Sequence, residues 1–181
     1  MNPAIEGPFT RAQGLKRLED FAGRAGRDYE LWRNYDLGPG RHHYVSMLSP
    51  FIRRRLLTEP EVIQKALEHH GLTAAEKFVQ EVCWRSYAKG WLEHRPGIWR
   101  DYVRGLQEDL VQCASYDHLG ERLCAAETGN TGLESFDTWA RELVETGYLH
   151  NHARMWFASI WIFTLKLPWR VGADFFYRHL L

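Results

Sequence analysis

The sequence has no excess of charge of either sign, because 23 basic residues balance 23 acidic ones. Such a chain does not find nucleic acid or a membrane surface through its net charge, so contact with phosphates requires a local patch. Cysteine is scarce too: there are three, with no C-x-x-C pair. Neither a disulfide framework nor a zinc site is indicated, so we expect no metal and a cytoplasmic protein.

Long apolar runs and the familiar phosphate-binding loops are also missing. The longest apolar run, Met155–Leu165, ends at Lys166 and is too short to cross a bilayer. The first residues, MNPAIEGPFTRAQ, lack the basic and apolar regions of a signal peptide. Neither G-x-G-x-x-G nor a Walker loop is present. We therefore expect no membrane contact and no nucleotide site of these two kinds.

What the chain does have is helical periodicity from end to end, and no segment alternates like a strand. We predict an all-α fold in one domain, with an irregular leader at residues 1–10 and a multi-helical domain at residues 11–181. Because the last predicted helix is still running at Leu181, we expect the native chain to continue.

Local signals predict where helices begin and end. Thr10 and Thr58 each precede a Gln or Glu by three residues, which is the pattern of a capping box. Ser49 before Pro50 predicts a side-chain N-cap for the next helix. Glycines predict helix ends near Gly71 and at Gly147.

The stretch 147–170 predicts one long helix with a polar head and a broad aromatic face. Its head contains His150, Asn151, His152 and Arg154. We expect its large aromatic residues to enter the core: Trp156, Phe157, Trp161 and Phe163. Such a helix can form one wall of a site for a flat ligand.

Two further groups allow both a structural and a functional interpretation. Ser46 and Ser49 can cap a helix or bind phosphate at its N-terminus. Glu81 lies close to Trp84 and Arg85 on a helical surface, which fits either an ion pair beside a core tryptophan or a working site.

Four motifs in order resemble the flavin-binding helical domain of the photolyase and cryptochrome family: VSMLSPF, FVQEVCWRSY, GNTGLESFD, and GYLHNHARMWFAS with LPWR. The match runs from about Arg11 to Leu181. It implies a multi-helical FAD-binding domain, incomplete at its C-terminal end and without the family's α/β antenna domain.

The resemblance implies residues that bind FAD. The family's pyrophosphate-binding segment corresponds to Val45, Ser46, Met47, Leu48 and Ser49, with valine in place of the usual threonine. Tyr29 corresponds to a flavin-phosphate contact. Asn151 and Arg154 correspond to residues that line the flavin pocket.

The resemblance also implies residues that meet damaged DNA. Glu81 and Trp84 correspond to catalytic residues that hydrogen-bond and stack on the flipped pyrimidines, and Arg85 to an arginine that supports DNA and flavin. Arg33 and Met155 correspond to residues near the lesion. Trp169 corresponds to the middle tryptophan of the electron chain. The outer member of that chain is replaced by Ala126.

These correspondences predict a monomeric, blue-light-driven lyase that passes an electron from reduced FAD to a pyrimidine dimer in DNA. The alternatives are a cryptochrome-like FAD photoreceptor that signals without repair, and a flavin-free helical scaffold.

Overall fold

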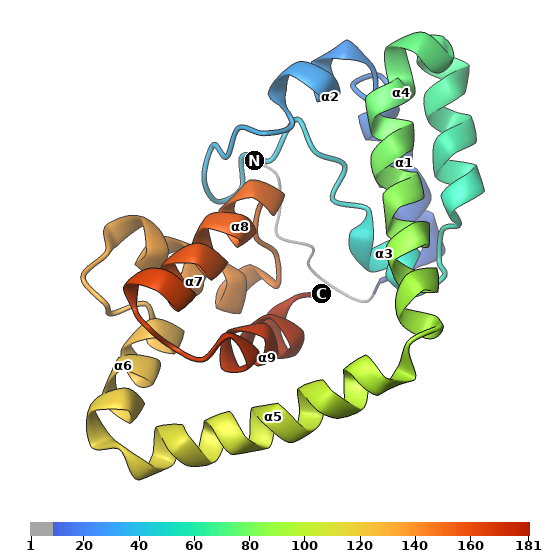
Figure 1. Ribbon diagram of the computed structural model, residues 1–181. Helices are drawn as coiled ribbons and strands as arrows, with labels where there is room; N and C mark the ends of the chain where they lie inside the picture. Colours follow the sequence, from blue (N-terminus) through green and yellow to red (C-terminus); the bar gives the residue numbers. More distant parts are fainter. Residues whose placement is uncertain (1–8) are drawn as a thin grey trace. The chain divides into compact units, whose positions relative to one another are not determined.

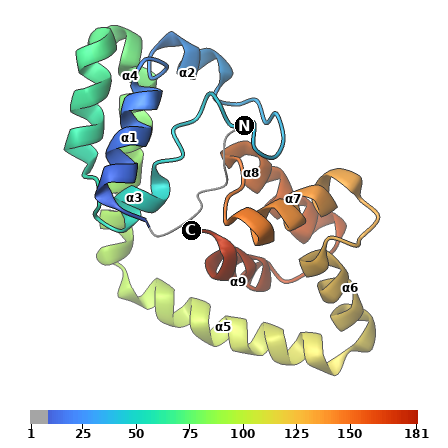
Figure 2. The same ribbon diagram turned by 180° about the vertical axis from the view of Figure 1, so that it is seen from behind.

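Two compact units make up the chain in the computed structural model, which describes residues 9–181 (Figures 1 and 2). The first unit ends at His94 and the second covers Arg95–Leu181. All but the last two positions of the expected leader lie outside the described residues. Helices account for all regular structure in residues 9–181, so the predicted all-α class is confirmed.

The first unit is built on four helices: α1 (Arg11–Ala22), α2 (Arg27–Trp32), α3 (Ser49–Arg53) and α4 (Glu59–Glu93). Both predicted capping boxes form, at Thr10 with Gln13 and at Thr58 with Glu61. Gly71 interrupts α4 with a φ of 65°, a conformation that glycine adopts without steric cost. The two halves of α4 lie side by side in both views, so the predicted helix end at Gly71 is confirmed as a reversal of the chain.

The prediction for Ser49 was wrong. Leu48 occupies the N-cap of α3 and no side chain caps the helix there, while Ser49 is already its first helical residue. The Leu48 carbonyl accepts the amide hydrogens of Phe51 and Ile52, each at 3.0 Å. The serine hydroxyl is therefore exposed to solvent and not used in capping.

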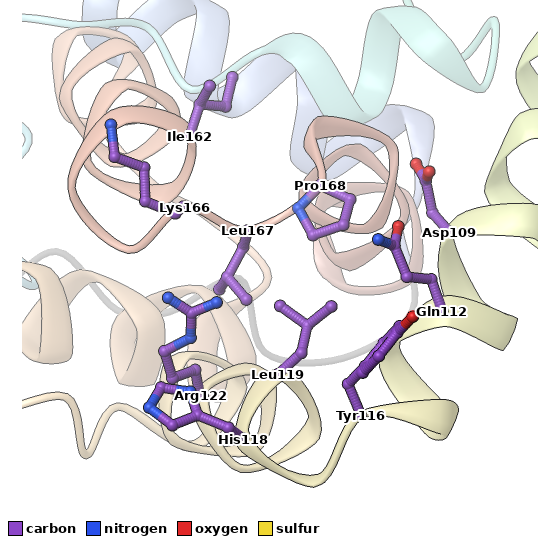
Figure 3. Close-up of a pocket in the computed structure, with 10 residues that line it drawn as sticks. All are labelled: Asp109, Gln112, Tyr116, His118, Leu119, Arg122, Ile162, Lys166, Leu167 and Pro168. Atoms are coloured by element: carbon purple, nitrogen blue, oxygen red, sulfur yellow. The ribbon is translucent and has the colours of Figure 1, made fainter.

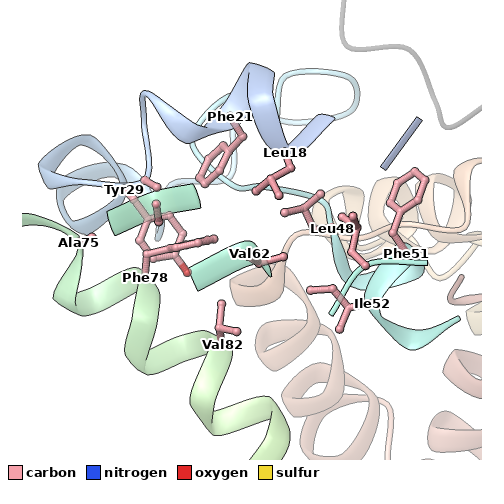
Figure 4. Close-up of a cluster of buried hydrophobic side chains, with 13 residues drawn as sticks. Leu18, Phe21, Tyr29, Leu48, Phe51, Ile52, Val62, Ala75, Phe78 and Val82 are labelled. Carbon is pink, nitrogen blue, oxygen red and sulfur yellow. The ribbon is translucent and has the colours of Figure 1, made fainter. Parts of the chain in front are cut away.

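Apolar side chains from all four helices form the core of the first unit (Figure 4). Phe21, Tyr29 and Phe78 meet at its centre, with the Tyr29 ring centroid 5.1 Å from that of Phe78. An ion pair between Arg11 and Glu61 adds a link between α1 and α4. The hydrogen bonds from Arg11 and then Thr58 lower the pKa of Glu61 to about 2.

The second unit contains α5 (Pro96–Ser115), α6 (Asp117–Thr128), α7 (Glu134–Thr146), α8 (Asn151–Ser159) and α9 (Trp169–His179). In both views α9 lies beside α5. Gly147 ends α7 with a φ of 66°, as predicted. Within the part of the chain that the structure describes, no helix has the length and apolar character needed to cross a bilayer.

The single long helix predicted for 147–170 was wrong. The segment contains α8, then a π-helical turn at Ile160–Thr164, then a non-helical link to α9. Lys166 lies in that link with a φ of 52°, in the left-handed region that non-glycine residues seldom adopt. The helical face therefore turns after Ser159, and residues beyond it no longer follow the period of α8.

Only half of the predicted aromatic core of this segment is buried. Phe157 and Trp161 are 0% and 1% exposed, whereas Trp156 and Phe163 are 45% and 67% exposed. The π-helical turn changes the angular position of Phe163, and Trp156 lies on Trp139 at the surface, with ring centroids 5.8 Å apart.

Candidate functional site

The first unit brings together three of the predicted residues, Tyr29, Arg33 and Glu81. Arg33 is the C-cap residue of α2, and its Nη1 lies 3.1 Å from Oε1 of Glu81 on α4. The same guanidinium lies over the Tyr29 ring, 5.7 Å from its centroid. Burial raises the pKa of Tyr29, whose ring belongs to the core.

Glu81 has two cationic partners, and neither of them is Arg85, the partner expected from the sequence. Besides Arg33, it contacts Nζ of Lys77 at 3.3 Å, one helical turn earlier on α4. Arg85 instead faces Glu59, with 3.8 Å between Nε and Oε1, so the interpretation of Glu81 and Arg85 as an ion pair was wrong. The sequence spacing of Lys77 and Glu81 is a signal that could have identified Lys77.

Trp84 is 60% exposed, so it is not a core tryptophan. Its ring meets the exposed Tyr87 edge to face, with centroids 5.4 Å apart. An indole held this way on α4 keeps much of its surface free for a flat partner. Burial lowers the pKa of the Arg85 guanidinium, and the nearby positive charges of Arg53 and Arg55 lower it further.

The segment 45–49 divides into buried and accessible positions. Met47 and Leu48 are 7% and 1% exposed, so they can offer a ligand only their backbone groups. Met47 has a φ of 51°, in the left-handed region that non-glycine residues seldom adopt. Ser46 is half-buried and Ser49 is exposed, while Val45 packs against the core.

In the second unit, Asn151, Arg154 and Met155 lie in the first turn and a half of α8. His150 caps this helix, because its Nδ1 accepts the amide hydrogen of His152 at 3.2 Å. Asn151 and Met155 are exposed. The buried histidine of this polar head thus caps the helix, and the residues that follow it form an accessible surface.

Arg154 is a half-buried guanidinium that no carboxylate of residues 9–181 neutralises. Its Nε donates to the Leu149 carbonyl at 2.8 Å, and it lies 5.5 Å from the centre of the Tyr148 ring. Burial lowers its pKa. Tyr148 was missed by sequence reasoning, since its position before the helix follows no helical spacing.

Trp169 begins α9 and is half exposed, with the Arg170 guanidinium 5.1 Å from its ring centroid. The Tyr102 ring on α5 lies 6.1 Å from it, and Trp99 lies 5.4 Å beyond Tyr102. Ala126, at the position expected for an aromatic residue, is fully buried. Tyr102 and Trp99 carry no sequence motif that could have marked them.

The accessible donors suit FAD, whose pyrophosphate and ring carbonyls accept hydrogen bonds. In the first unit these donors are the hydroxyls of Ser46 and Ser49; in the second they are the Asn151 amide and the unneutralised Arg154 guanidinium. The fold is multi-helical, and each unit presents such donors at its surface.

Comparison with known proteins identifies the family. Residues 78–181 match the family described as the FAD binding domain of DNA photolyase. This match covers more than half of the chain, which therefore belongs to that family, and FAD is its cofactor.

Curated relatives and solved structures agree with this assignment. The deoxyribodipyrimidine photo-lyases of Synechococcus and Thermus thermophilus are 28% and 34% identical over 92% and 75% of this chain, and 34% and 31% of their own lengths. A class III photolyase structure from Agrobacterium tumefaciens is 26% identical, with a TM-score of 0.71 over 94% of this chain and 34% of its own. The chain thus spans about a third of the length of these relatives.

A cryptochrome structure from Synechocystis shares the fold. It is 22% identical to this chain and has a TM-score of 0.71 over 99% of this chain and 37% of its own. The predicted resemblance and the predicted helical fold are both confirmed.

Proposed function

We propose that the chain is part of a photolyase that uses FAD and blue light to repair pyrimidine dimers in DNA. The observation that carries this proposal is the exposed Trp84, which lies one turn after a Glu81 carboxylate held by Arg33 and Lys77. The relatives named as deoxyribodipyrimidine photo-lyases support the reaction class. Reduced FAD would supply the electron that splits the dimer.

The residues of α4 would receive the damaged bases. A dimer must leave the base stack, at a cost of a few kcal/mol that is lower for a damaged site. Stacking on Trp84 would return about 1–3 kcal/mol per base, and Glu81 would accept hydrogen bonds from the base edges. Arg33 would act mainly by fixing Glu81, while Arg85 would contact a phosphate.

In the first unit, Ser46 and Ser49, with backbone groups from Val45 to Leu48, would bind the phosphates of FAD, and Tyr29 would support that segment from the core. In the second unit, the donors that the family resemblance assigns to the flavin ring are Asn151 and Arg154. The unneutralised charge of Arg154 supports its part in this proposal.

The proposal is tested by replacing Trp84 with alanine. A dimer-containing single-stranded oligonucleotide should bind about 5- to 150-fold more weakly, as the loss of 1–3 kcal/mol of stacking requires. Fluorescence anisotropy in the dark measures this affinity, and dimer conversion under blue light measures repair by the FAD-loaded protein.

Trp32→Ala serves as the matched control, because Trp32 is another exposed tryptophan of the same unit. Its affinity for the oligonucleotide should stay unchanged. Equal affinities for the parent and Trp84→Ala would refute the assignment of Trp84. FAD binding without any dimer conversion would instead support the cryptochrome-like photoreceptor.

We also propose that Trp169 relays electrons during light-driven reduction of the cofactor. Its aromatic contacts continue to Tyr102 and Trp99, whereas Ala126 offers no ring. Trp169→Phe should slow bleaching of the flavin absorbance under blue light with a thiol as electron donor. Trp156→Phe replaces an exposed tryptophan outside this contact chain and should leave the rate unchanged; equal slowing in both variants would contradict the relay.

A further inference from the structure

A further pocket lies in the second unit, and its lining includes none of the residues assigned above to cofactor or DNA. It is a cavity of about 670 Å³ between the end of α5, the start of α6 and the link that precedes α9 (Figure 3). This volume is within the range typical of small-molecule sites, about 300–1,000 Å³. None of the four motifs that mark the family contributes an assigned binding residue to it.

Two cationic side chains and a histidine line part of the cavity. His118 and Arg122 lie one turn apart on α6, and Lys166 lies in the link before α9. The one carboxylate in the lining, Asp109, is already paired with Arg170, with 3.2 Å between Oδ2 and Nη1. The remaining charge in the cavity is therefore positive.

These cations have unused hydrogen-bonding capacity. Among residues 9–181, neither Arg122 nor Lys166 has an ion pair or a side-chain hydrogen bond, and Nε of Arg122 is buried without a partner. A buried donor that stays unpaired costs free energy unless a ligand or water satisfies it. The Arg122 guanidinium is thus prepared for an acceptor inside the cavity.

The backbone adds an independent observation. Lys166 is held at a φ of 52°, and such strain, about 1–3 kcal/mol, persists where the surroundings fix it and is frequent at ligand sites. Two hydrogen bonds fix it here: the Leu165 amide donates to the Ile160 carbonyl at 2.9 Å, and the Leu167 amide to the Trp161 carbonyl at 3.0 Å. The π-helical turn just before it is another feature common at functional sites.

The rest of the lining is suited to a planar apolar group. Leu119 and Leu167 lie between the Arg122 side of the cavity and the side formed by Gln112 and Tyr116 in Figure 3. A ligand with an anionic end and a flat ring would meet cations at one side and apolar or aromatic surface at the other. Two cations and a histidine suit a doubly charged phosphate better than a single carboxylate.

We propose that this cavity binds a small organic phosphate, such as a mononucleotide. Arg122 and Lys166 hold its phosphate, and the surface of Leu119 and Tyr116 contacts its planar base. The site is separate from the proposed repair function and does not depend on it.

The test is isothermal titration calorimetry of the whole chain with adenosine 5′-monophosphate, in the presence of excess FAD. We expect one binding site. Arg122→Gln and Lys166→Gln should each weaken binding about tenfold or more, as the loss of a charged hydrogen bond implies. Inorganic phosphate should bind more weakly than the mononucleotide, because it lacks the base.

Lys166→Gly separates binding from folding. Glycine adopts a positive φ without strain, so this variant should melt at the parental temperature or higher and still lose binding about tenfold or more. Arg100→Gln, an exposed cation of α5 outside the cavity, and Trp84→Ala should both bind like the parent.

Three results would overturn the proposal. They are the absence of mononucleotide binding, its loss when FAD is added in excess, and equal affinity in the parent and the Arg122 and Lys166 variants. Tighter binding of inorganic phosphate than of the mononucleotide would refute the role of the apolar surface.

Discussion

Replacing Phe157 with alanine should lower the free energy of unfolding of the second unit by about 3–5 kcal/mol. Phe157 is fully buried, and its ring stacks on Phe136 at 4.2 Å between centroids and on Phe175 at 5.9 Å. Phe176 meets it edge to face at 5.2 Å. The free energy of unfolding of a native protein is typically about 5–15 kcal/mol, so this loss is a large part of the stability.

Urea unfolding followed by circular dichroism measures this loss. Trp156→Ala, the adjacent residue on α8, is the matched control and should cost about 1 kcal/mol, because Trp156 is 45% exposed and contacts mainly Trp139 and His152. If the two variants lose the same stability, the division of α8 into a buried and an exposed face is wrong.

The contrast between these neighbours shows what periodicity could and could not predict. Hydrophobic spacing correctly identified Phe157 and Trp161 as core residues, and it included Trp156 and Phe163 only because they are aromatic and close to the same face. The π-helical turn at Ile160–Thr164 shifts that face, and no propensity in the sequence marks where such a turn forms. Helix existence was therefore predictable and its register was not.

Helix ends were predictable where a side chain makes the capping hydrogen bond, and they were less predictable elsewhere. Thr10 and Thr58 cap their helices with partners three residues away, which is a local interaction. The prediction for Ser49 was wrong because the helix begins one residue earlier than expected, with Leu48 as its N-cap after a Met47 with positive φ. Met47 and Leu48 are both buried, and such burial is a tertiary feature that local sequence signals do not specify.

The motifs identified the residues of the candidate site. They did not identify the charged residues that pair with them. Spacing suggested that Glu81 pairs with Arg85, yet α2 delivers Arg33 from 48 positions earlier in the chain, and Arg85 turns to Glu59. Contacts of this kind depend on how helices pack, which a single sequence does not specify. The exposure of Trp84 likewise emerged only from the structure.

The GNTGLESFD motif, which contributed to the family resemblance, has a structural role in this chain. Asp137 lies one turn into α7 and is 7% exposed. Its Oδ1 accepts the amide hydrogen of Thr131 at 2.9 Å and the Thr131 hydroxyl at 2.7 Å, and its Oδ2 accepts the Gly132 amide hydrogen at 3.0 Å. The carboxylate thus fastens the 129–132 turn to the helix that follows.

Asp137→Ala should therefore destabilise the second unit by about 3 kcal/mol. The substitution leaves two backbone amides of the turn without their acceptor, and a hydrogen bond to a charged group contributes about 1.5–3 kcal/mol. Thermal and urea unfolding measure the loss. Glu134→Ala is the control, since it removes a carboxylate from the first turn of the same helix and should cost only about 0.3–1 kcal/mol through the helix dipole.

The effect of pH provides a second test of the same bonds. Burial opposes ionisation of Asp137, yet the hydrogen bonds from Thr131 and Gly132 hold its pKa below the usual value of an aspartate. A lowered folded-state pKa stabilises the protein above the unfolded-state pKa, about 3.9, and this stabilisation disappears as the pH falls. The stability difference between the parent and Asp137→Ala should therefore shrink as the pH falls below about 4. A difference that stays constant down to about pH 2 would show that the carboxylate acts by its shape and not by its charge.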